Sequence, residues 1–410
     1  MESHGDADSV SATSGITSSR VLRKIRMAQR ISRVDISRAL NLNKSTVTKV
    51  VADFMDVGIV KVAAEGHAGP QGGRKPKYLT LDPAFGCVIG VEIRTDSWIS
   101  VAVDLNGRII DTLSEALAPG DLAPGGSRVV DLFLEIASTM REQLRRQGQR
   151  VLGAGLGIAG IIDHTNGIIL QSNPLTIHEP VRVYEEASSR LGLPVLVDND
   201  ANCGCWAQLA YPETERHENS VFVLGEFRRP DTSDSDYRSI SVGLGFVLGG
   251  KVHHGRDYSA GEFRSILWRP GNTTQFSVSD TESSRVREDP RLHERMYREL
   301  CDHIAFLVNT LNLDHVVFSD TFGFSSEYVI KVCREAIEEN WSYSNQARCD
   351  IGISPLGERA VACGSAGMFL EHLFSVPDVS DPRTRMRTGV HLLADILKDC
   401  NPAYTATHQL

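Results

Sequence analysis

The chain has 410 residues, 41% of them hydrophobic and 23% charged, which is typical of a folded protein of two or three domains. No apolar run reaches the roughly 18 residues of a membrane-spanning helix. The polar N-terminus lacks the apolar segment of a signal peptide. We therefore expect a cytoplasmic protein that does not contact a membrane, with residues 1–16 forming a flexible tail.

The eight cysteines are scattered along the chain, which does not suggest a disulfide framework and favours a reducing compartment. Cys203 and Cys205 are the one close pair. A thiolate metal site there would need further ligands, and no second cysteine pair or histidine cluster lies nearby in the sequence. We interpret the pair as small buried residues of a helix.

Residues 31–56 have the pattern of two helices joined by a tight turn. Ser32 is suited to cap the first helix, Asn43 to cap the second, and Gly58 to end it. The second helix carries an apolar stripe formed by Val47, Val50, Val51, Phe54 and Met55. Such a helix fits the major groove of DNA, and its polar residues are the predicted contacts: Lys44, Ser45, Thr46, Thr48 and Lys49.

Two segments of strand composition, residues 59–62 and 78–81, flank a glycine-rich basic loop. Together with the helices they predict a winged helix-turn-helix domain over residues 17–82, whose loop adds Arg74 and Lys75 as DNA contacts. Residues 20–81 hold 13 Lys and Arg against 4 Asp and Glu, a net charge of +9, whereas the whole chain carries −9. A helical adaptor that touches no DNA is the alternative, but it leaves this charge asymmetry unexplained.

From residue 86 the pattern changes to alternating strands and helices, which predicts an α/β body with two lobes around a cleft. We expect strands over residues 86–93 and 97–104, a long helix over 129–147 and a buried strand over 151–162. The expected first lobe comprises residues 85–200 and 385–410, and the second comprises residues 201–384. An amphipathic helix near residues 388–398 is expected to fold back on the first lobe.

The order of the motifs resembles the ROK family of repressors, open reading frames and sugar kinases. The matching segments are GGRKP, GVEIRTDSWISVAVDLNGRII, GLGIAGIID, VDNDAN, GLGFVLGGKVHHG and AGEF. The resemblance covers nearly all of the chain after about Ile16 and is to the winged-helix branch, similar to xylose and N-acetylglucosamine repressors. It implies a winged helix followed by the two-lobed, actin-like fold of sugar kinases and ATPases, and a role in regulating carbohydrate genes.

A sugar kinase of this family needs glycine turns that hold the phosphates of ATP. The first loop resembles DxGGT, and both glycines are replaced in the matching residues 92–96. The second, TGxGxG, aligns with residues 240–245, which lack the hydroxyl residue and the first glycine. The Gly-Gly of the adenosine loop is missing from residues 319–323. Three altered loops predict a protein without kinase activity or cofactor.

The sugar-binding positions of the family are better kept. Asp200 matches the catalytic aspartate of the kinases, Asn199 its sugar-binding neighbour, and Glu262 the glutamate that contacts the sugar. Asn173 matches an asparagine of the preceding sugar loop. Carboxylates and carboxamides suit polyols because they pair with hydroxyl groups. A strand-to-helix turn capped by Asp200 is a compatible structural interpretation.

The family's zinc motif, GHxnCxCGxxGC, is not kept, because Ser265 stands in place of the histidine and no cysteine lies between Cys205 and Cys301. We therefore predict no metal site. Arg264, next to this position, is suited to bind an anionic group such as a sugar phosphate. A surface ion pair is an equally good interpretation of Arg264.

The sequence thus predicts a transcriptional regulator, a repressor and homodimer or higher homo-oligomer, that binds a double-stranded DNA operator. A sugar or sugar phosphate would close the two lobes and change the spacing of the DNA-binding domains. Two alternatives remain open: a ROK sugar kinase with a DNA-binding head, and a constitutive DNA-binding protein whose body serves only for dimerisation.

Overall fold

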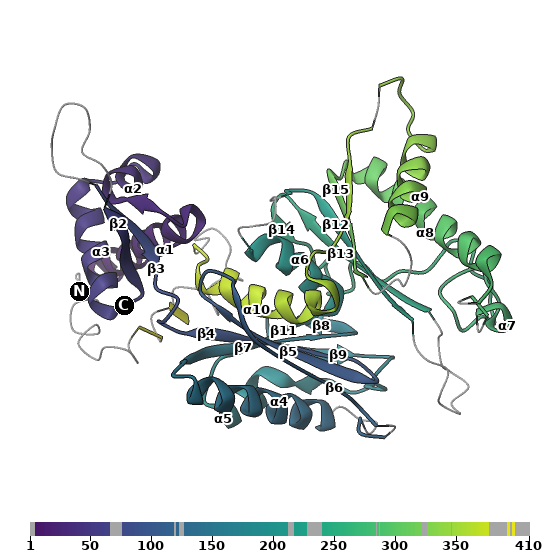
Figure 1. Cartoon of the computed structure of the whole chain (residues 1–410), viewed down its shortest axis with the longest axis horizontal. Helices are drawn as coiled ribbons and strands as arrows, with labels where there is room; N and C mark the ends of the chain where they lie inside the picture. The colour runs from purple at the N-terminus through teal and green to yellow at the C-terminus, as the bar shows by residue number, and fades with distance from the viewer. Residues whose placement is uncertain are drawn as a thin grey trace.

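The computed structural model describes residues 5–65, 76–118, 120–122, 127–211, 217–227, 240–283, 285–286, 288–320, 326–345, 347–376, 392–393 and 396–397. An N-terminal unit, residues 5–81, lies beside a larger α/β body that contains two five-stranded sheets (Figure 1). Within the described residues, none of the helices is long and apolar enough to cross a membrane.

The N-terminal unit packs helices against a small antiparallel sheet of order β1-β3-β2. Its elements are α1 (Gly5–Ala28), β1 (Ile31–Ser32), α2 (Arg33–Leu40), α3 (Lys44–Val57), β2 (Val60–Glu65) and β3 (Lys77–Leu81). Strands β2 and β3 pair antiparallel from Val60 opposite Leu81 to Glu65 opposite Lys77. The two strands that the sequence predicted on either side of the basic loop are therefore paired.

The helix ends of this unit follow the local sequence. The Ser32 hydroxyl accepts a hydrogen bond from the Asp35 amide at 3.3 Å and so caps α2, as predicted. Asn43 stands at the start of α3, although its side chain makes no capping hydrogen bond. Gly58 ends α3 with a φ of 90°, a conformation that favours glycine. The predicted apolar stripe is buried at Val47, Val50, Val51 and Phe54.

Helix α1 begins at Gly5, so the prediction of a flexible tail over residues 1–16 and a domain start at residue 17 is wrong from Gly5 onward. The sequence prediction relied on the polar composition of this segment. Once Val21, Leu22 and Ile25 are packed, however, the helix has its nucleus, and each further turn towards the N-terminus costs little.

The first sheet of the body has the order β11-β7-β4-β5-β6. Strands β11, β7 and β4 are parallel, and β5 and β6 continue antiparallel. Helices α4 and α5 cover one face (Figure 1). The elements are β4 (Cys87–Ile93), β5 (Ser97–Asp104), β6 (Ile109–Ala116), α4 (Ser127–Arg146), β7 (Val151–Ile158), α5 (Val183–Leu191) and β11 (Val195–Asn199), with a small side sheet of β8 (Ile161–Asp163), β9 (Ile168–Gln171) and β10 (Val181–Arg182).

Two helices lie between the sheets: α6 (Asp200–Ala210) and α10 (Ala360–Leu373) (Figure 1). A Cβ atom added at Gly90 or Gly155 would collide with backbone carbonyl oxygens of α10, so these glycines let α10 lie directly on the first sheet. Because α10 packs on this sheet, the chain returns to the first lobe by residue 360. The predicted return at residue 385 is wrong, since a glycine-rich contact between distant segments leaves no local signal at residue 360.

The second sheet has the order β14-β13-β12-β15-β16. Helices α8 and α9 pack on one face, and α6 contacts the other. The elements are β12 (Ser220–Phe227), β13 (Ile240–Leu248), β14 (Lys251–Val252), α7 (Asp280–Ser283), α8 (Pro290–Leu311), β15 (His315–Phe318), α9 (Ser326–Glu339) and β16 (Asp350–Ile353). Cys203 and Cys205 are buried in α6, which confirms their interpretation as small buried helix residues.

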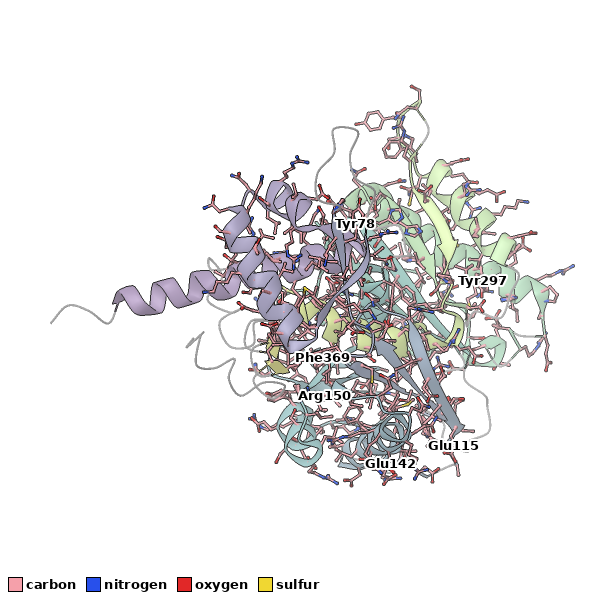
Figure 2. All side chains as sticks on the ribbon, turned by 60° about the vertical axis from the view of Figure 1, so that its left-hand side comes forward. Tyr78, Glu115, Glu142, Arg150, Tyr297 and Phe369 are labelled. Carbon is pink, nitrogen blue, oxygen red and sulfur yellow. The ribbon has the colours of Figure 1, made fainter. Side chains whose placement is uncertain are left out.

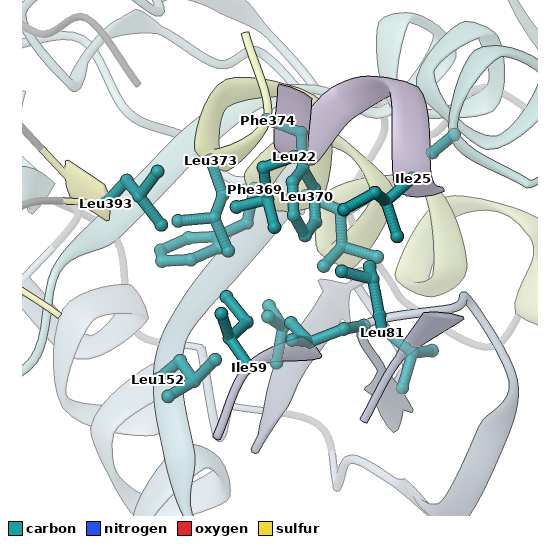
Figure 3. Close-up of a cluster of buried hydrophobic side chains, with 14 of the residues drawn as sticks. Leu22, Ile25, Ile59, Leu81, Leu152, Phe369, Leu370, Leu373, Phe374 and Leu393 are labelled. Atoms are coloured by element: carbon teal, nitrogen blue, oxygen red, sulfur yellow. The ribbon is translucent and has the colours of Figure 1, made fainter. Parts of the chain in front are cut away.

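One hydrophobic core is shared by the N-terminal unit and the body. It contains Leu22, Ile25, Ile59 and Leu81 of the unit together with α10 residues such as Phe369 (Figure 3). Figure 2 labels Phe369 next to the N-terminal unit, in agreement with its place in this core. Of the predicted helix at residues 388–398, the described residues 392–393 and 396–397 are helical, and Leu393, Ile396 and Leu397 are buried in this core.

Candidate functional site

The first sheet ends at a turn in which Asn199 closes β11 and Asp200 opens α6. The Asn199 side-chain oxygen accepts hydrogen bonds from the amides of Ala201 and Asn202 at 2.9 and 3.2 Å, and its amide group donates to the Gly160 carbonyl at 2.9 Å. Asn199 therefore caps α6, and the interpretation of Asp200 as the cap is wrong. The extended backbone of Asn199 provides the geometry of a cap, whereas Asp200 is already helical.

Asp200 lies half-buried among other carboxyl groups. Burial, followed by the negative charges of Glu226, Glu92 and Glu262, raises its pKa to about 7, although a hydrogen bond from the Ala201 amide opposes the rise. At neutral pH the carboxyl group can therefore either donate or accept a hydrogen bond. This suits a sugar hydroxyl, which also does both.

Glu262 reaches the same region from the second half of the body. A bridge between Glu262 and Gly243 joins its backbone to β13, and the Leu244 amide donates to the Gly261 carbonyl at 3.0 Å. Gly261 has a φ of 94°, and a Cβ atom there would collide with the carbonyl oxygen of Leu244. The glycine thus fixes the position of Glu262, whose side chain is exposed.

Asn173 and Arg264 are not joined to this turn by any of their described contacts. Asn173 is exposed, and its side-chain oxygen accepts a hydrogen bond from Gln171 at 3.1 Å. The Arg264 guanidinium carbon lies 4.5 Å from the centre of the Trp268 ring, a cation–π contact. Arg264 therefore has an aromatic neighbour, and neither the ligand contact nor the surface ion pair considered from the sequence is tested by this contact.

On the opposite side of the site, Arg94 contacts groups from several elements. Its guanidinium binds both carboxylate oxygens of Glu92, at 2.7 and 3.0 Å, and donates to the Glu358 carbonyl at 3.0 Å. It also lies 3.8 Å from a carboxylate oxygen of Glu226 on β12. One guanidinium thus connects β4, β12 and the segment before α10.

This cluster lies in the segment that matches the first phosphate loop of the kinases. Arg94 replaces a glycine, and Glu92 is only 2% exposed. Burial raises the pKa of Glu92 to about 7, against the opposing effect of Arg94, and Glu226 adds to the rise. A phosphate would meet two carboxylates and a guanidinium that is already paired, an environment unfavourable to an anion.

The described residues of the other two altered loops take part in a strand pair and in a hydrogen bond within the protein. Residues 240–245 belong to β13 and pair with β12, Gly243 opposite Leu224 and Gly245 opposite Phe222. Ser319, the first residue of the altered adenosine loop, accepts a hydrogen bond from the Gly225 amide at 3.1 Å. Residues 321–325 lie outside the described part of the chain.

A histidine cluster next to Asn199 was not predicted from the sequence. The fully buried Asp198 accepts hydrogen bonds from the Trp206 indole at 2.8 Å and from Asn202 at 3.2 Å, and lies 2.8 Å from His254 Nε2. The His164 ring stacks on His254 with ring centres 3.5 Å apart, and Tyr258 meets His164 edge-on. The pair His253-His254 ahead of the AGEF segment was the one signal available in the sequence.

The pKa values of the two histidines in this cluster are shifted in opposite directions. Burial by itself would raise the pKa of Asp198, but His254 and the hydrogen bonds hold it well below its usual range. Burial opposes protonation of His254, yet Asp198 outweighs it and raises the His254 pKa. Burial and the charge on His254 lower the pKa of His164 to about 4. Asp198 and His254 therefore form an ion pair that ties the loop before Glu262 to the end of β11.

Ser265, at the position of the family's zinc-binding histidine, is used in loop packing. Its amide donates to the Gln275 carbonyl at 2.9 Å, and its hydroxyl accepts from the Leu267 amide at 3.0 Å. Among the residues that the structure describes, no group of three or more His, Cys, Asp or Glu side chains is arranged to hold a metal ion.

A second candidate surface is the start of α3. Lys44, Ser45, Thr48 and Lys49 are exposed, Thr46 is half-buried, and the Thr48 hydroxyl donates to the Lys44 carbonyl at 2.7 Å. No acidic residue lies in the first turn of this helix. The predicted contacts Arg74 and Lys75 lie outside the described residues.

Comparison with known proteins finds similarity to one protein family and to named relatives. A model described as "ROK family" matches residues 104–270. A protein named xylose repressor from Caldicellulosiruptor bescii is 23% identical over 404 residues, covering 87% of this chain and 96% of that protein. The chain thus resembles the ROK family over residues 104–270 and is similar to a protein named xylose repressor over most of its length.

Solved structures of ROK proteins share the fold. A ROK family transcriptional regulator, described as a homologue of the E. coli MLC protein, has a TM-score of 0.71 at 16% identity and covers 94% of this chain and 100% of its own. A ROK glucokinase from Streptomyces griseus, solved with glucose and AMPPNP, has a TM-score of 0.52 at 19% identity and covers 69% of this chain and 99% of its own. The ROK α/β fold is thus common to a regulator and to a kinase.

Proposed function

We propose that this ROK protein is a sugar-responsive transcriptional repressor of carbohydrate genes. The observation that carries the proposal is the Asn199–Asp200 turn, which keeps groups suited to a sugar, while Arg94, Glu92 and Glu226 fill the region where a kinase holds phosphate. The similarity to a xylose repressor over 87% of the chain supports the same conclusion.

The N-terminal unit acts as a winged helix-turn-helix domain in this proposal. Helix α3 presents an exposed, basic first turn, and β2 and β3 form the strands of the wing. The residues that face the major groove are Lys44, Ser45, Thr46, Thr48 and Lys49, with Arg74 and Lys75 on the wing loop. Two such units in a homodimer read the two halves of a palindromic operator, because a single unit contacts too few base pairs for high specificity.

The effector is an uncharged sugar in this proposal, and not the sugar phosphate considered from Arg264. After burial, which is the largest cause, the carboxyl groups of Glu226, Glu92 and Glu262 also raise the pKa of Asp200, so that its surroundings are negative. A phosphate would add to this repulsion, and Arg264 stacks on Trp268. Asn199, Asp200 and Glu262 hydrogen-bond the hydroxyl groups, and Asn173 joins them when the sugar is bound.

A kinase is the second candidate, because a carboxyl group with a pKa of about 7 is well suited to accept a proton from a sugar hydroxyl. The Arg94 cluster and the pairing of β13 with β12 oppose this function, since they occupy the described residues that match two phosphate loops of the kinases. Incubation with ATP and sugars decides between the two: we expect no turnover, and turnover that Asp200→Asn abolishes would establish the kinase.

The proposal is tested by capturing fragmented genomic DNA with the purified full-length protein at physiological salt and sequencing what is retained. We expect a few palindromic sites near carbohydrate genes. Bulk, salt-sensitive retention without enriched sites would show that the N-terminal unit lacks sequence specificity. A thermal-shift panel of D-xylose, D-glucose and N-acetyl-D-glucosamine then identifies the effector, because a ligand at 100 times its Kd adds about 2.7 kcal/mol of stability.

A further inference from the structure

Arg26 joins the N-terminal unit to the body through buried polar contacts. It lies in the last turn of α1, and only 3% of its side chain is exposed. Its guanidinium donates to Glu371 of α10 at 2.6 Å and to the Ala210 carbonyl at 2.5 Å, and it lies 5.0 Å above the Phe374 ring. A buried guanidinium needs its hydrogen bonds, so these acceptors fix where α1 sits.

The same contacts lead to the sugar turn through one helix. Asn199 and Asp200 stand at the start of α6, and Ala210, which accepts from Arg26, is its last residue. Eleven residues separate the two ends by about 16 Å along the helix axis at the ordinary α-helical rise. A displacement of the sugar turn along this axis therefore moves a hydrogen-bond acceptor of Arg26.

Helix α10 provides the second acceptor and a surface along which α6 can shift. A Cβ atom at Gly364 would collide with the Cys203 carbonyl, and one at Gly367 would lie 2.8 Å from the Ala210 side chain, so the two helices touch through their backbones. Their relative position is thus set by close contact, and a movement between them changes the distance between the Ala210 carbonyl and Glu371, the two groups that Arg26 bridges.

We propose that Arg26 couples the sugar turn to the DNA-binding unit by sensing the relative position of α6 and α10. The inference rests on the proposed function. Sugar binding at Asn199 and Asp200 shifts α6 against α10, and Arg26 transmits the shift to α1 and the packed α3. The Nε of the guanidinium has no hydrogen-bond partner among the described residues, so Arg26 keeps one N–H donor for a new acceptor when the two helices shift.

A purely structural role makes a different prediction. If Arg26 only neutralises the buried Glu371, the shared core of Leu22, Ile25 and Phe374 would hold the unit in one position whatever the sugar does. Removing the ion pair would then lower stability and leave the effect of sugar on DNA affinity unchanged. The coupling ratio, the operator Kd with saturating sugar divided by the Kd without it, separates the two roles because it does not depend on overall stability.

The test uses the full-length protein, a captured operator and the panel sugar with the largest thermal shift. Glu371→Gln keeps an acceptor for Arg26 but removes the charge, and Arg26→Lys keeps the charge but lacks the planar, forked guanidinium that reaches both acceptors. The control is Arg128→Gln, which breaks an exposed pair with Glu135 on α4. For the wild type and the control we expect a coupling ratio within the usual range of about 5 to 150.

For Glu371→Gln and Arg26→Lys we expect the sugar Kd and the sugar-free operator Kd to stay within about threefold of the wild-type values. A change of this size is small compared with the usual coupling ratio. Their coupling ratio should fall towards 1. A folded Glu371→Gln variant with the wild-type ratio overturns the proposal, even if Arg26→Lys fails to fold. A wild-type ratio of 1 with every panel sugar would instead refute the proposed function.

Discussion

The Asn199–Asp200 turn and the Glu92–Arg94 segment both end strands of the first sheet, yet their polar groups are satisfied in different ways. At the Asn199–Asp200 turn, Asn199 uses its side chain to hold the backbone, and Asp200 stays half-buried with a pKa near neutrality. At the other segment, Glu92 is bound on both oxygens by Arg94 within the protein. In the proposed function the first turn binds an external ligand, whereas at Glu92 an internal cation satisfies the carboxylate.

The largest effect is expected from removing that cation. Arg94→Met leaves Glu92 and Glu226 close together without their positive partner, so the free energy of unfolding should fall by about 3–5 kcal/mol. Urea denaturation at pH 8 measures the loss. Arg128→Met, which breaks an exposed pair, should cost about 0–1 kcal/mol. Equal losses in the two variants would mean that the Arg94 cluster has no special structural role.

The next largest effect concerns the sugar turn. Asp200→Asn removes the ionised form of the side chain, which accepts hydrogen bonds on both oxygens. We expect the effector sugar to bind about 10- to 150-fold more weakly. This loss corresponds to about 1.5–3 kcal/mol, the usual contribution of a hydrogen bond to a charged group. Isothermal titration measures the change. The Arg94→Met variant, if folded, should keep the sugar affinity within severalfold. The opposite ranking would place the sugar at the Arg94 cluster.

A smaller effect separates the capping role of Asn199 from its ligand role. Asn199→Ala and Asp289→Ala each remove a side-chain cap, from α6 and α8, and each should lower stability by about 1 kcal/mol. Only Asn199→Ala should also weaken sugar binding, as thermal shifts with and without sugar would show. If both variants bind the sugar as the wild type does, Asn199 is a structural residue alone.

The last prediction concerns the pH dependence of stability that arises from Asp200. Its pKa is raised from 3.8 to about 7 in the folded protein, so the protonated group stabilises the fold below pH 3.8, and this contribution is lost as the pH rises to about 7. Asn does not titrate. The stability of Asp200→Asn relative to the wild type should therefore increase between pH 4 and 7 and level off above. A flat difference across this range would show that the Asp200 pKa is ordinary.

Local signals in the sequence were sufficient for much of the fold. The cap at Ser32, the stop at Gly58 and the stripe of Val47, Val50 and Phe54 depend on neighbours within a few residues, and all were predicted. The start of α1 and the return of the chain at α10 were not. Both depend on packing between segments far apart in the sequence, which composition and periodicity do not report.

In the candidate site, too, local features were predicted from the sequence and contacts between distant segments were not. The altered glycines of residues 92–96 were visible in the sequence, but the pairing of Arg94 with Glu226 joins strands more than a hundred residues apart. The ion pair of Asp198 and His254 was missed for the same reason. The roles of Asn173, Asn199, Asp200, Glu262 and Arg264 as ligand contacts, and of the α3 and wing residues as DNA contacts, remain predictions.

The most direct test of a sugar-controlled repressor is the affinity of the protein for a captured operator, measured by fluorescence anisotropy with and without the effector sugar. For the wild type we predict that saturating sugar weakens operator binding by a factor of about 5 to 150, and that Asp200→Asn removes the effect at the same sugar concentration. A sugar that binds at Asp200 and stabilises the protein, yet leaves the operator Kd unchanged, would contradict the account.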